Sequence, residues 1–363
     1  MHIVVIAGIR SQFMKVAAMQ RALPLLSAYI RREDVTFVDA GQHYDRELAG
    51  SFHDELQIDF NVSFKHKDHR PTFVFTSMIE QLSEFLSELK QRQRVDFVVV
   101  FGDANATLAG TLAAVRNDLQ LVHVEAGLRT GNRHSPEELN RIIADHSAVV
   151  RFISSKWDWR NIEREGLSES SYFAGDLIYD LVLSLKPEVS QLAPTLDGSP
   201  FVLMTIHRAE HLGDATTMKS ILDAIGAIDR KVLFITHPRT RATIGSLQYE
   251  LPPNVEISHS YPYKSLLKAI MDCEFVVTDS GALQREAFYL RKRCVICQAL
   301  PFWQGLVAAG IHRAAPPASR ELHEAIEWVD LAARTLEYPE CSDLGNGTAG
   351  RTILEKLVAL SQT

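Results

Sequence analysis

Two acidic side chains stand directly after short apolar runs, where they could perform acid–base chemistry. Asp103 follows the run at 97–101, and Glu125 closes the run that begins at Leu121. Carboxylates at the ends of neighbouring buried strands can share one cleft and have their pKa values pushed apart, so that one acts as an acid and the other as a base. Asp103 could instead cap a helix that begins near Ala106. For Glu125, which Ala-Gly follows directly, we favour the catalytic interpretation.

Two basic side chains follow the first apolar run at 3–7. Gly8 lets the backbone approach a ligand there, and the Arg10 guanidinium could bind a phosphate through two hydrogen bonds. Lys15 follows about one and a half helical turns later. The positions of Arg10 and Lys15 alone do not decide whether they are solvated surface charges or phosphate ligands.

The segment SPEELNR predicts a helix that begins at Pro136. Ser135 is the expected N-cap, and Glu138 would complete a capping box with it. Glu137 and Arg141 are four residues apart and therefore share one helical face. They could form an exposed ion pair, or present a carboxylate and a cation to the site.

Histidines follow two apolar runs in the second half of the chain. His207 and Arg208 come after the run at 201–206, and His237 comes after the run at 232–236. A histidine and an arginine at a strand end could donate hydrogen bonds to developing negative charge. A single histidine is more often structural, so the sequence leaves both roles open.

The segment TDSGALQREA follows another apolar run and opens a helix. Its backbone N–H groups and the Ser280 hydroxyl, next to Gly281, predict a phosphate site. Glu286 could bind two ribose hydroxyls, or stabilise the helix dipole from the first turn. Cys294 and Cys297 have CxxC spacing, but they lie on an expected buried strand and have no second pair, so we expect no zinc site.

The elements that must position these residues are short continuous apolar runs, which are typical of parallel strands covered on both faces. The first half has runs at 3–7, 35–38, 97–101, 121–124 and 149–153, with helices expected at 12–31, 72–93, 106–117 and 135–147. The second half has runs at 201–206, 232–236, 255–257, 275–278 and 294–297, with helices expected at 217–228, 263–271 and 283–289. This alternation predicts an α/β protein with two Rossmann-like domains, whose mostly parallel sheets face a central cleft. The proline-containing segment 175–199 is the expected linker.

Composition limits the function classes. The chain has 38 Lys and Arg against 45 Asp and Glu, a formal net charge of -7, so no basic field attracts nucleic acid. The first apolar run is short and leads into a glycine turn, which indicates a buried strand and not a signal peptide. Apolar runs stay well below the roughly 18 residues of a membrane span. Four cysteines form no disulfide framework and indicate reduced thiols, so we expect a cytoplasmic protein without a membrane partner.

Taken in order, the motifs resemble those of the non-hydrolysing UDP-N-acetylglucosamine 2-epimerases. The matching segments are GIRSQFMK, AGQHYD, FGDANATLAG, HVEAGLRTGN with PEELNR, TIHRAE, TDSGALQREA and GNGTAGR. The resemblance covers nearly the whole chain and implies the GT-B-type fold. It implies an N-terminal domain over 1–175, a nucleotide-binding domain over 176–347, and a helix at about 348–363 that packs back on the first domain. It also implies a homodimer that serves polysaccharide biosynthesis.

The family removes UDP from C1 and the proton from C2 of a 2-acetamido sugar, then adds both back with the proton on the other face. The resemblance implies no metal or redox cofactor. It assigns catalysis to Asp103, Glu125, Glu137 and His207, and substrate binding to Arg10, Lys15, Arg141, Ser280, Gly281 and Glu286. Gln42, His43, Arg208 and His237 match positions where some bacterial members bind a second, allosteric substrate molecule.

Two segments depart from the family pattern. The family's Ser-Gly-Gly with Gln-Glu-Glu reads here as Ser-Gly-Ala at 280–282 with Gln-Arg-Glu at 284–286. Where the family has an arginine and then a Thr-Glu-Arg-Pro-Glu-like segment, this chain reads QALPFWQG at 298–305, so Gln298 replaces a charge. Phe302 and Trp303 could contact a less polar sugar substituent or a base, or pack against a helix at 306–309.

These observations favour a nucleotide-sugar 2-epimerase that interconverts UDP-GlcNAc and UDP-ManNAc, or a close 2-acetamido analogue. The alternative enzyme is a hydrolysing relative that releases free sugar and UDP. Outside the enzymes, the alternative is a nucleotide-sugar-binding protein that has lost turnover. A GT-B glycosyltransferase would share the fold, but not the GDANAT and HVEAGLR motifs.

Overall fold

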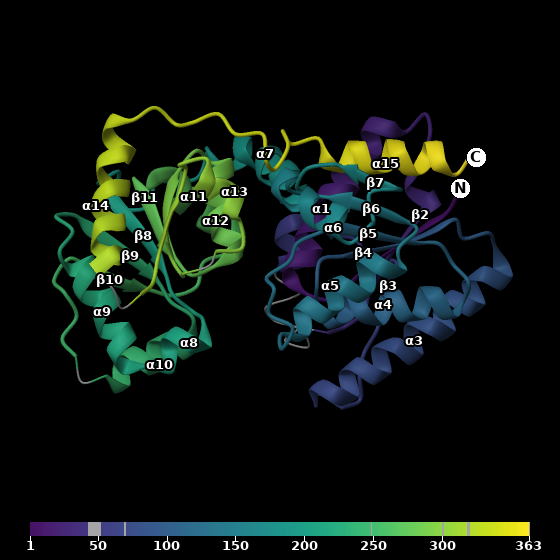
Figure 1. The fold of residues 1–363 in the computed structure, drawn as a ribbon, viewed down its shortest axis with the longest axis horizontal. Coiled ribbons are helices and arrows are strands. Elements are labelled where there is room, and N and C mark those ends of the chain that lie inside the picture. The colour runs from purple at the N-terminus through teal and green to yellow at the C-terminus, as the bar shows by residue number, and fades with distance from the viewer. Residues whose placement is uncertain (43–51, 69, 248, 300, 318–319, 363) are drawn as a thin grey trace. The chain divides into compact units, whose positions relative to one another are not determined.

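The computed structural model describes residues 1–42, 52–68, 70–247, 249–299, 301–317 and 320–362. The chain divides into two compact units, one formed by 1–181 together with 342–363 and the other by 182–341. Each unit is a parallel sheet with helices on both faces (Figure 1). The predicted α/β class with two parallel sheets is confirmed.

The sheet of the first unit has the order β3-β2-β1-β4-β5-β6-β7, with parallel pairing throughout. Its strands are β1 (Ile3–Ala7), β2 (Val35–Asp39), β3 (Val62–Ser63), β4 (Phe97–Phe101), β5 (Leu121–Ala126), β6 (Val150–Ile153) and β7 (Ser171–Phe173). The direction of strand succession reverses between β1 and β4. In open α/β sheets, the loops that diverge from such a point bind the ligand.

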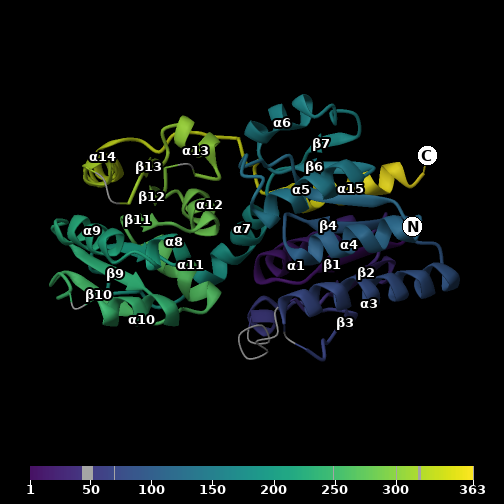
Figure 2. The same cartoon turned by 60° about the horizontal axis from the view of Figure 1, so that its bottom comes forward.

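Helices cover both faces of this sheet. They are α1 (Arg10–Ala22), α3 (Pro71–Arg92), α4 (Asn105–Arg116), α5 (Pro136–Ser147), α6 (Trp159–Arg164) and α15 (Ala349–Leu360), with 3-10 turns at Leu23–Leu26, Arg32–Asp34 and Lys156–Asp158. Helices α3 and α4 run side by side on one face (Figure 2), and α1 and α15 contact each other on the opposite face. Helix α4 packs so closely that a Cβ on Gly110 would lie 2.8 Å from Val100 Cγ1.

Two expectations about the helices are corrected. The helix expected at 12–31 ends at Ala22, because Pro24 has no N–H to donate to a carbonyl of the preceding turn, and the chain continues as the 3-10 turn. The expected linker at 175–199 contains helix α7 (Leu177–Val189), which keeps Pro187 in its last turn. The division between the two units falls within α7, after Leu181.

The sheet of the second unit has the order β10-β9-β8-β11-β12-β13, again with parallel pairing. Its strands are β8 (Phe201–Thr205), β9 (Lys231–Ile235), β10 (Val255–Ser258), β11 (Phe275–Thr278), β12 (Arg293–Cys297) and β13 (Arg313–Ala315). Its helices are α8 (Ala209–Leu212), α9 (Ala215–Gly226), α10 (Pro238–Ser246), α11 (Tyr263–Asp272), α12 (Gly281–Tyr289), α13 (Gln304–Ala308) and α14 (Arg320–Thr335). Helices α9 and α14 share one core with the sheet, and α11 and α12 lie on its other face (Figure 1). The strand order reverses between β8 and β11, so those two strand ends should carry the site of this unit.

Candidate active site

Glu125 projects from an irregular position in β5. The pairing of β5 with β6 shifts register between Val124 and Ala126, so Glu125 is an extra residue in the strand, a β-bulge. Its φ of 70° lies in the left-handed region, which costs a residue with a side chain about 1–2 kcal/mol. Bulges re-aim side chains, and strained backbone of this kind clusters at functional sites.

The Glu125 carboxylate forms an ion pair with the ammonium of Lys15, which α1 holds in the interior. The Lys15 side chain is 5% exposed, so its interpretation as a solvated surface charge is wrong. Gly102 lies against this pair: its φ is 59°, and a Cβ there would lie 3.3 Å from Lys15 Nζ. Arg10 is exposed at the first residue of α1, with its Cζ 4.5 Å from the centroid of the Phe52 ring.

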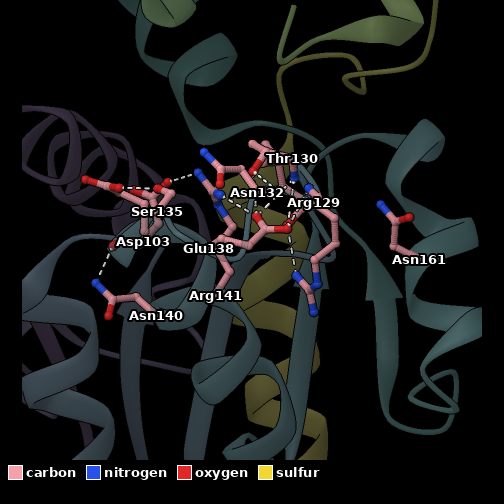
Figure 3. Close-up of polar contacts among 12 residues, drawn as sticks. Asp103, Arg129, Thr130, Asn132, Ser135, Glu138, Asn140, Arg141 and Asn161 are labelled. Carbon is pink, nitrogen blue, oxygen red and sulfur yellow. Dashed lines mark hydrogen bonds and ion pairs between the residues drawn. The ribbon is translucent and has the colours of Figure 1, made fainter. Parts of the chain in front are cut away.

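Asp103 pairs with the guanidinium of Arg141, which is buried on α5. The backbone oxygen of Asp103 accepts a hydrogen bond of 2.8 Å from Asn140 Nδ2 (Figure 3). The capping role considered for Asp103 is wrong, because Ala104 is the N-cap residue of α4. Asp103 follows Gly102 in the loop after β4, and Gly102 contacts the Lys15–Glu125 pair. This loop therefore connects the two ion pairs.

Glu138 binds the loop after β5. Its carboxylate accepts hydrogen bonds from the N–H groups of Thr130 and Gly131 at 3.0 and 2.8 Å, and it pairs with Arg141 at 2.9 Å (Figure 3). The predicted capping box is therefore wrong, although α5 begins at Pro136 as expected. Burial raises the pKa of Glu138, but the hydrogen bonds from Thr130 and Gly131 hold it below its usual value overall.

Glu137 lies in the first turn of α5 and is exposed. Its carboxylate accepts a hydrogen bond from the Ser135 hydroxyl. Arg141 is buried against Glu138 and Asp103, so the exposed Glu137–Arg141 pair considered from the sequence is wrong. The same helix thus offers one exposed carboxylate and one buried cation.

Sequence reasoning missed a buried network of charges behind these residues. His123 and Asp145 are fully buried and paired, and Arg129 connects Asp145 to Glu165. A histidine inside the apolar strand LVHVEA was the available signal, because a polar side chain on a covered strand requires a buried partner.

Asp158 is buried at the end of the turn Lys156–Asp158. Burial and the nearby carboxylates of Asp343 and Glu125 raise its pKa from 3.8 to about 8. Between about pH 4 and about pH 8, the folded protein therefore keeps a proton on Asp158 that the unfolded chain has already lost. The free energy of unfolding falls as the pH rises through this window.

We expect Asp158→Asn to remove much of this pH dependence. Its Tm should fall less than that of the wild type when the pH rises from about 5 to about 8.5, because the asparagine stays neutral throughout. Thermal unfolding at both pH values measures the effect, with Glu169→Gln, an exposed carboxylate of the same unit, as the control. Equal Tm losses in Asp158→Asn and the wild type would contradict the prediction.

Asp279, directly after β11, is the centre of the cluster in the second unit. Its fully buried carboxylate accepts hydrogen bonds from the N–H groups of His207 and Arg208 and from Nδ1 of His207 and His211, at distances of 2.9 to 3.1 Å. Burial alone would raise the pKa of Asp279, but the bonds from His207 and His211 hold it well below its usual range. The ring of His207 is half exposed, and its Nε2 lies on the side opposite the atom bound to Asp279.

The start of α12 follows Asp279. Ser280 is the N-cap residue, and its Oγ accepts a hydrogen bond of 3.4 Å from the N–H of Leu283. A Cβ on Gly281 would lie 3.3 Å from the Phe302 ring, so this ring lies against the helix start. Glu286 is buried beyond the first turn, which contains no acidic residue, so the helix-dipole interpretation of Glu286 is wrong.

The two departures from the family pattern contact each other. Trp303 is buried, its Nε1 donates a 2.9 Å hydrogen bond to the Gly281 oxygen, and Arg285 Cζ lies 4.3 Å from its ring centroid. The side-chain amide of Gln298 faces Arg208. With its oxygen oriented toward Arg208, it accepts hydrogen bonds from the Arg208 guanidinium at 2.8 and 2.9 Å. The same guanidinium lies 5.1 Å from the centroid of the Phe302 ring. The altered segment therefore packs on α12 and on Arg208.

The remaining candidate allosteric residues make contacts with helix ends. Gln42 Oε1 accepts a 2.8 Å hydrogen bond from the N–H of Ala106 at the start of α4. His237 is the N-cap residue of α10, and burial together with the positive charge of Arg239 lowers its pKa. His43 lies outside the described residues. Gln42 and His237 thus have structural roles whether or not they bind a ligand.

The two parallel-sheet units, with polar clusters at their strand ends, define an α/β protein of the GT-B type. A crystal structure of the Methanocaldococcus jannaschii UDP-GlcNAc 2-epimerase, in complex with UDP-GlcNAc and UDP, has a TM-score of 0.82 and 24% sequence identity over 99% of this chain and 100% of that chain. The model of the UDP-N-acetylglucosamine 2-epimerase family matches residues 29–358. The chain belongs to that family, which confirms the resemblance seen in the motifs.

Two curated relatives extend this comparison. The UDP-N-acetylglucosamine 2-epimerase homolog of Methanococcus maripaludis is 29% identical over 98% of this chain and 99% of its own length. The UDP-2,3-diacetamido-2,3-dideoxy-D-glucuronate 2-epimerase of Pseudomonas aeruginosa is 29% identical over 85% of this chain and 87% of its own length. Among the helices that the structure describes, none has the length and apolar character needed to cross a membrane.

Proposed function

We propose that this protein is a nucleotide-sugar 2-epimerase, an isomerase that interconverts UDP-GlcNAc and UDP-ManNAc or close 2-acetamido analogues. The observation that carries the proposal is the buried Lys15–Glu125 pair at a strained bulge, with the Asp103–Arg141 pair in the adjoining loop. The first unit thus combines carboxylates that can move a proton with cations that stabilise negative charge. Membership of the epimerase family and its named relatives support the same reaction.

In the proposed reaction, the bond from C1 to the diphosphate oxygen breaks and the oxygen keeps the electron pair. A carboxylate takes the C2 proton, so a double bond forms between C1 and C2 and gives a 2-acetamidoglucal. Addition then reverses both steps, with the proton delivered to the other face of C2. Because the two proton transfers occur on opposite faces, the reaction needs more than one acid–base group, and we assign this role to Asp103, Glu125 and Glu137.

The departing UDP carries negative charge, and we assign its stabilisation to cations and hydrogen-bond donors. Arg10, Lys15 and Arg141 supply positive charge, and His207 assists at the diphosphate while Asp279 fixes its ring. Ser280 and Gly281, at the start of α12, would bind the diphosphate through the helix N-terminus, and Glu286 would bind the ribose. We further propose that the protein acts as a cytoplasmic homodimer, as expected for the family.

Incubation with UDP-GlcNAc in deuterated water, followed by proton NMR, tests the proposal. An epimerase places deuterium at C2 and produces UDP-ManNAc, whereas a hydrolysing relative releases free sugar and UDP. A nucleotide-sugar-binding protein without turnover leaves the substrate unchanged although calorimetry detects binding. Absence of C2 exchange with UDP-GlcNAc and with every 2-acetamido analogue tested would refute the assignment.

The altered segment predicts that UDP-GlcNAc is not the preferred substrate. Gln298 has no charge to offer a phosphate, and the Phe302 ring places apolar surface against Gly281, where the diphosphate would bind. We therefore expect a modified nucleotide sugar to bind more tightly or to turn over faster than UDP-GlcNAc. The Pseudomonas aeruginosa relative, named for a 2,3-diacetamido glucuronate, provides one member of the panel.

Calorimetric titration and kcat/KM measurements across such a panel check this expectation. UDP alone serves as the reference ligand, because it separates recognition of the sugar from recognition of the nucleotide. Tighter binding and faster turnover of UDP-GlcNAc than of every alternative would contradict it.

A further inference from the structure

A buried histidine–aspartate pair connects three segments of the first unit. His123 Nε2 lies 2.8 Å from the backbone oxygen of Gly102, in the loop after β4. His123 Nδ1 lies 2.6 Å from Oδ1 of Asp145, on α5. The other oxygen of Asp145 accepts a hydrogen bond of 3.1 Å from the N–H of Gly127, in the loop after β5. Two of these segments carry the candidate carboxylates Asp103 and Glu137, and the third begins directly after β5, two residues from Glu125.

The hydrogen-bond geometry fixes the number of protons in this pair. Both ring nitrogens of His123 face oxygen atoms, one a carbonyl that can only accept. Nε2 must therefore carry a proton, and a second proton must lie between Nδ1 and Asp145. The pair is formally neutral, and Arg129 adds a positive charge 2.7 Å from Oδ2 of Asp145. Both side chains are fully buried, so water does not compete with these bonds.

The hydrogen bonds of the His123–Asp145 pair end on two backbone atoms near Glu125, the residue with positive φ. Gly127 comes two residues after Glu125, and its N–H is held by Asp145. Gly102 lies against the Lys15–Glu125 pair, and its carbonyl is held by His123. A residue with positive φ persists only where its surroundings fix it, and these contacts supply such a constraint.

We propose that His123 and Asp145 are positioning residues that hold Glu125 in its left-handed bulge and hold the Asp103 loop beside it. Without the acceptor for the Gly127 N–H, the bulge relaxes toward extended backbone and the Glu125 carboxylate leaves Lys15. The kinetic consequence rests on the proposed function: the chemical step suffers, whereas the nucleotide contacts that we assign to Ser280, Gly281 and Glu286 of the second unit do not change.

Three substitutions separate the contacts. Asp145→Asn keeps the shape of the side chain, but removes its charge and replaces one acceptor oxygen with a donor. His123→Asn places an amide near the Nδ1 position and retains only the contact with Asp145, whereas His123→Gln reaches the Nε2 position and retains only the contact with Gly102. Glu165→Gln is the matched control, because it changes the far end of the same network at Arg129.

We expect Asp145→Asn to lower kcat about 10- to 100-fold while KM and the Kd of UDP change less than about threefold. The two His123 variants should each lower kcat by a smaller factor, and Glu165→Gln should stay within about threefold of the wild type. Hydrogen exchange should rise in the peptide covering 121–131 of Asp145→Asn while the rest of the unit stays protected. A merely structural role would instead lower kcat, UDP affinity and thermal stability together.

Wild-type kcat with unchanged exchange at 121–131 in Asp145→Asn would overturn the proposal, and so would a parallel loss of all three properties. A wild-type protein that exchanges no C2 proton on any nucleotide sugar would instead refute the proposed function. In that case hydrogen exchange, together with the φ of Glu125 in a crystal structure of Asp145→Asn, still decides whether the pair positions Glu125.

Discussion

Glu125→Gln should lower turnover at least about a hundredfold while the affinity for UDP stays within about threefold. Glutamine keeps the shape of the side chain, but it cannot take up or release a proton at C2. The substitution also leaves the buried Lys15 ammonium uncompensated, and breaking a buried ion pair costs about 3–5 kcal/mol of stability. Deuterium exchange at C2 measures the turnover, calorimetry the UDP affinity, and thermal unfolding the stability.

The double variant Lys15→Met with Glu125→Gln separates chemistry from stability. Methionine has a similar length and no charge, so we expect the double variant to regain most of the lost stability without regaining turnover. Asp103→Asn should show a comparable loss of turnover, and Glu163→Gln, exposed on α6, is the control. If Glu125→Gln and Asp103→Asn both turn over a verified substrate at nearly the wild-type rate, the acid–base assignment is wrong.

The second large effect is expected for Asp279→Asn. Asp279 accepts hydrogen bonds from two backbone N–H groups and two histidine rings, whereas asparagine has one acceptor oxygen and an amide that opposes donors. The loops after β8 and β11 should therefore lose their fixed positions, and the His207 ring its orientation. We expect UDP affinity to fall at least about tenfold and turnover at least about a hundredfold.

Glu210→Gln provides the matched control for Asp279→Asn. Glu210 lies 3.6 Å from Arg208 and 3.7 Å from His211, but its side chain is 64% exposed, so its charge contributes little. Calorimetry with UDP and a kcat measurement on both variants distinguish the buried carboxylate from the exposed one. Wild-type UDP affinity in folded Asp279→Asn, or equal losses in both variants, would contradict the role given to Asp279.

The strands were predictable because the apolar runs reflect burial on both faces of a parallel sheet. β1, β4 and β11 begin and end where the sequence predicts. Polar positions at or just after the strand ends were predictable for the same reason, since parallel strands end at one edge of a sheet, although β5 extends through Glu125 to Ala126. This is why Asp103, Glu125 and His207 could be selected without an alignment.

The pairing of side chains could not be predicted, because it depends on contacts between segments far apart in the chain. Glu138 fits the spacing of a capping box, yet Thr130, Gly131 and Arg141 compete for its carboxylate and offer more hydrogen bonds. From the sequence alone, Lys15 could be a surface residue. In the structure it is buried, and the bulge in β5 directs Glu125 toward it. Likewise, neither Phe302 nor Gly281 carries any local signal of their mutual contact.

The return of residues 342–363 to the first unit affects the order in which the protein can fold during synthesis. Asp180 accepts hydrogen bonds from the N–H groups of Ala349 and Gly350, and Asp343 accepts one from the N–H of Trp157. The ribosome must therefore translate the whole of 182–341 before these contacts can form. The second unit, which is continuous in the chain, can fold first. Until α15 is made, the surface of the first unit that α15 covers stays exposed, where it can bind chaperones or aggregate.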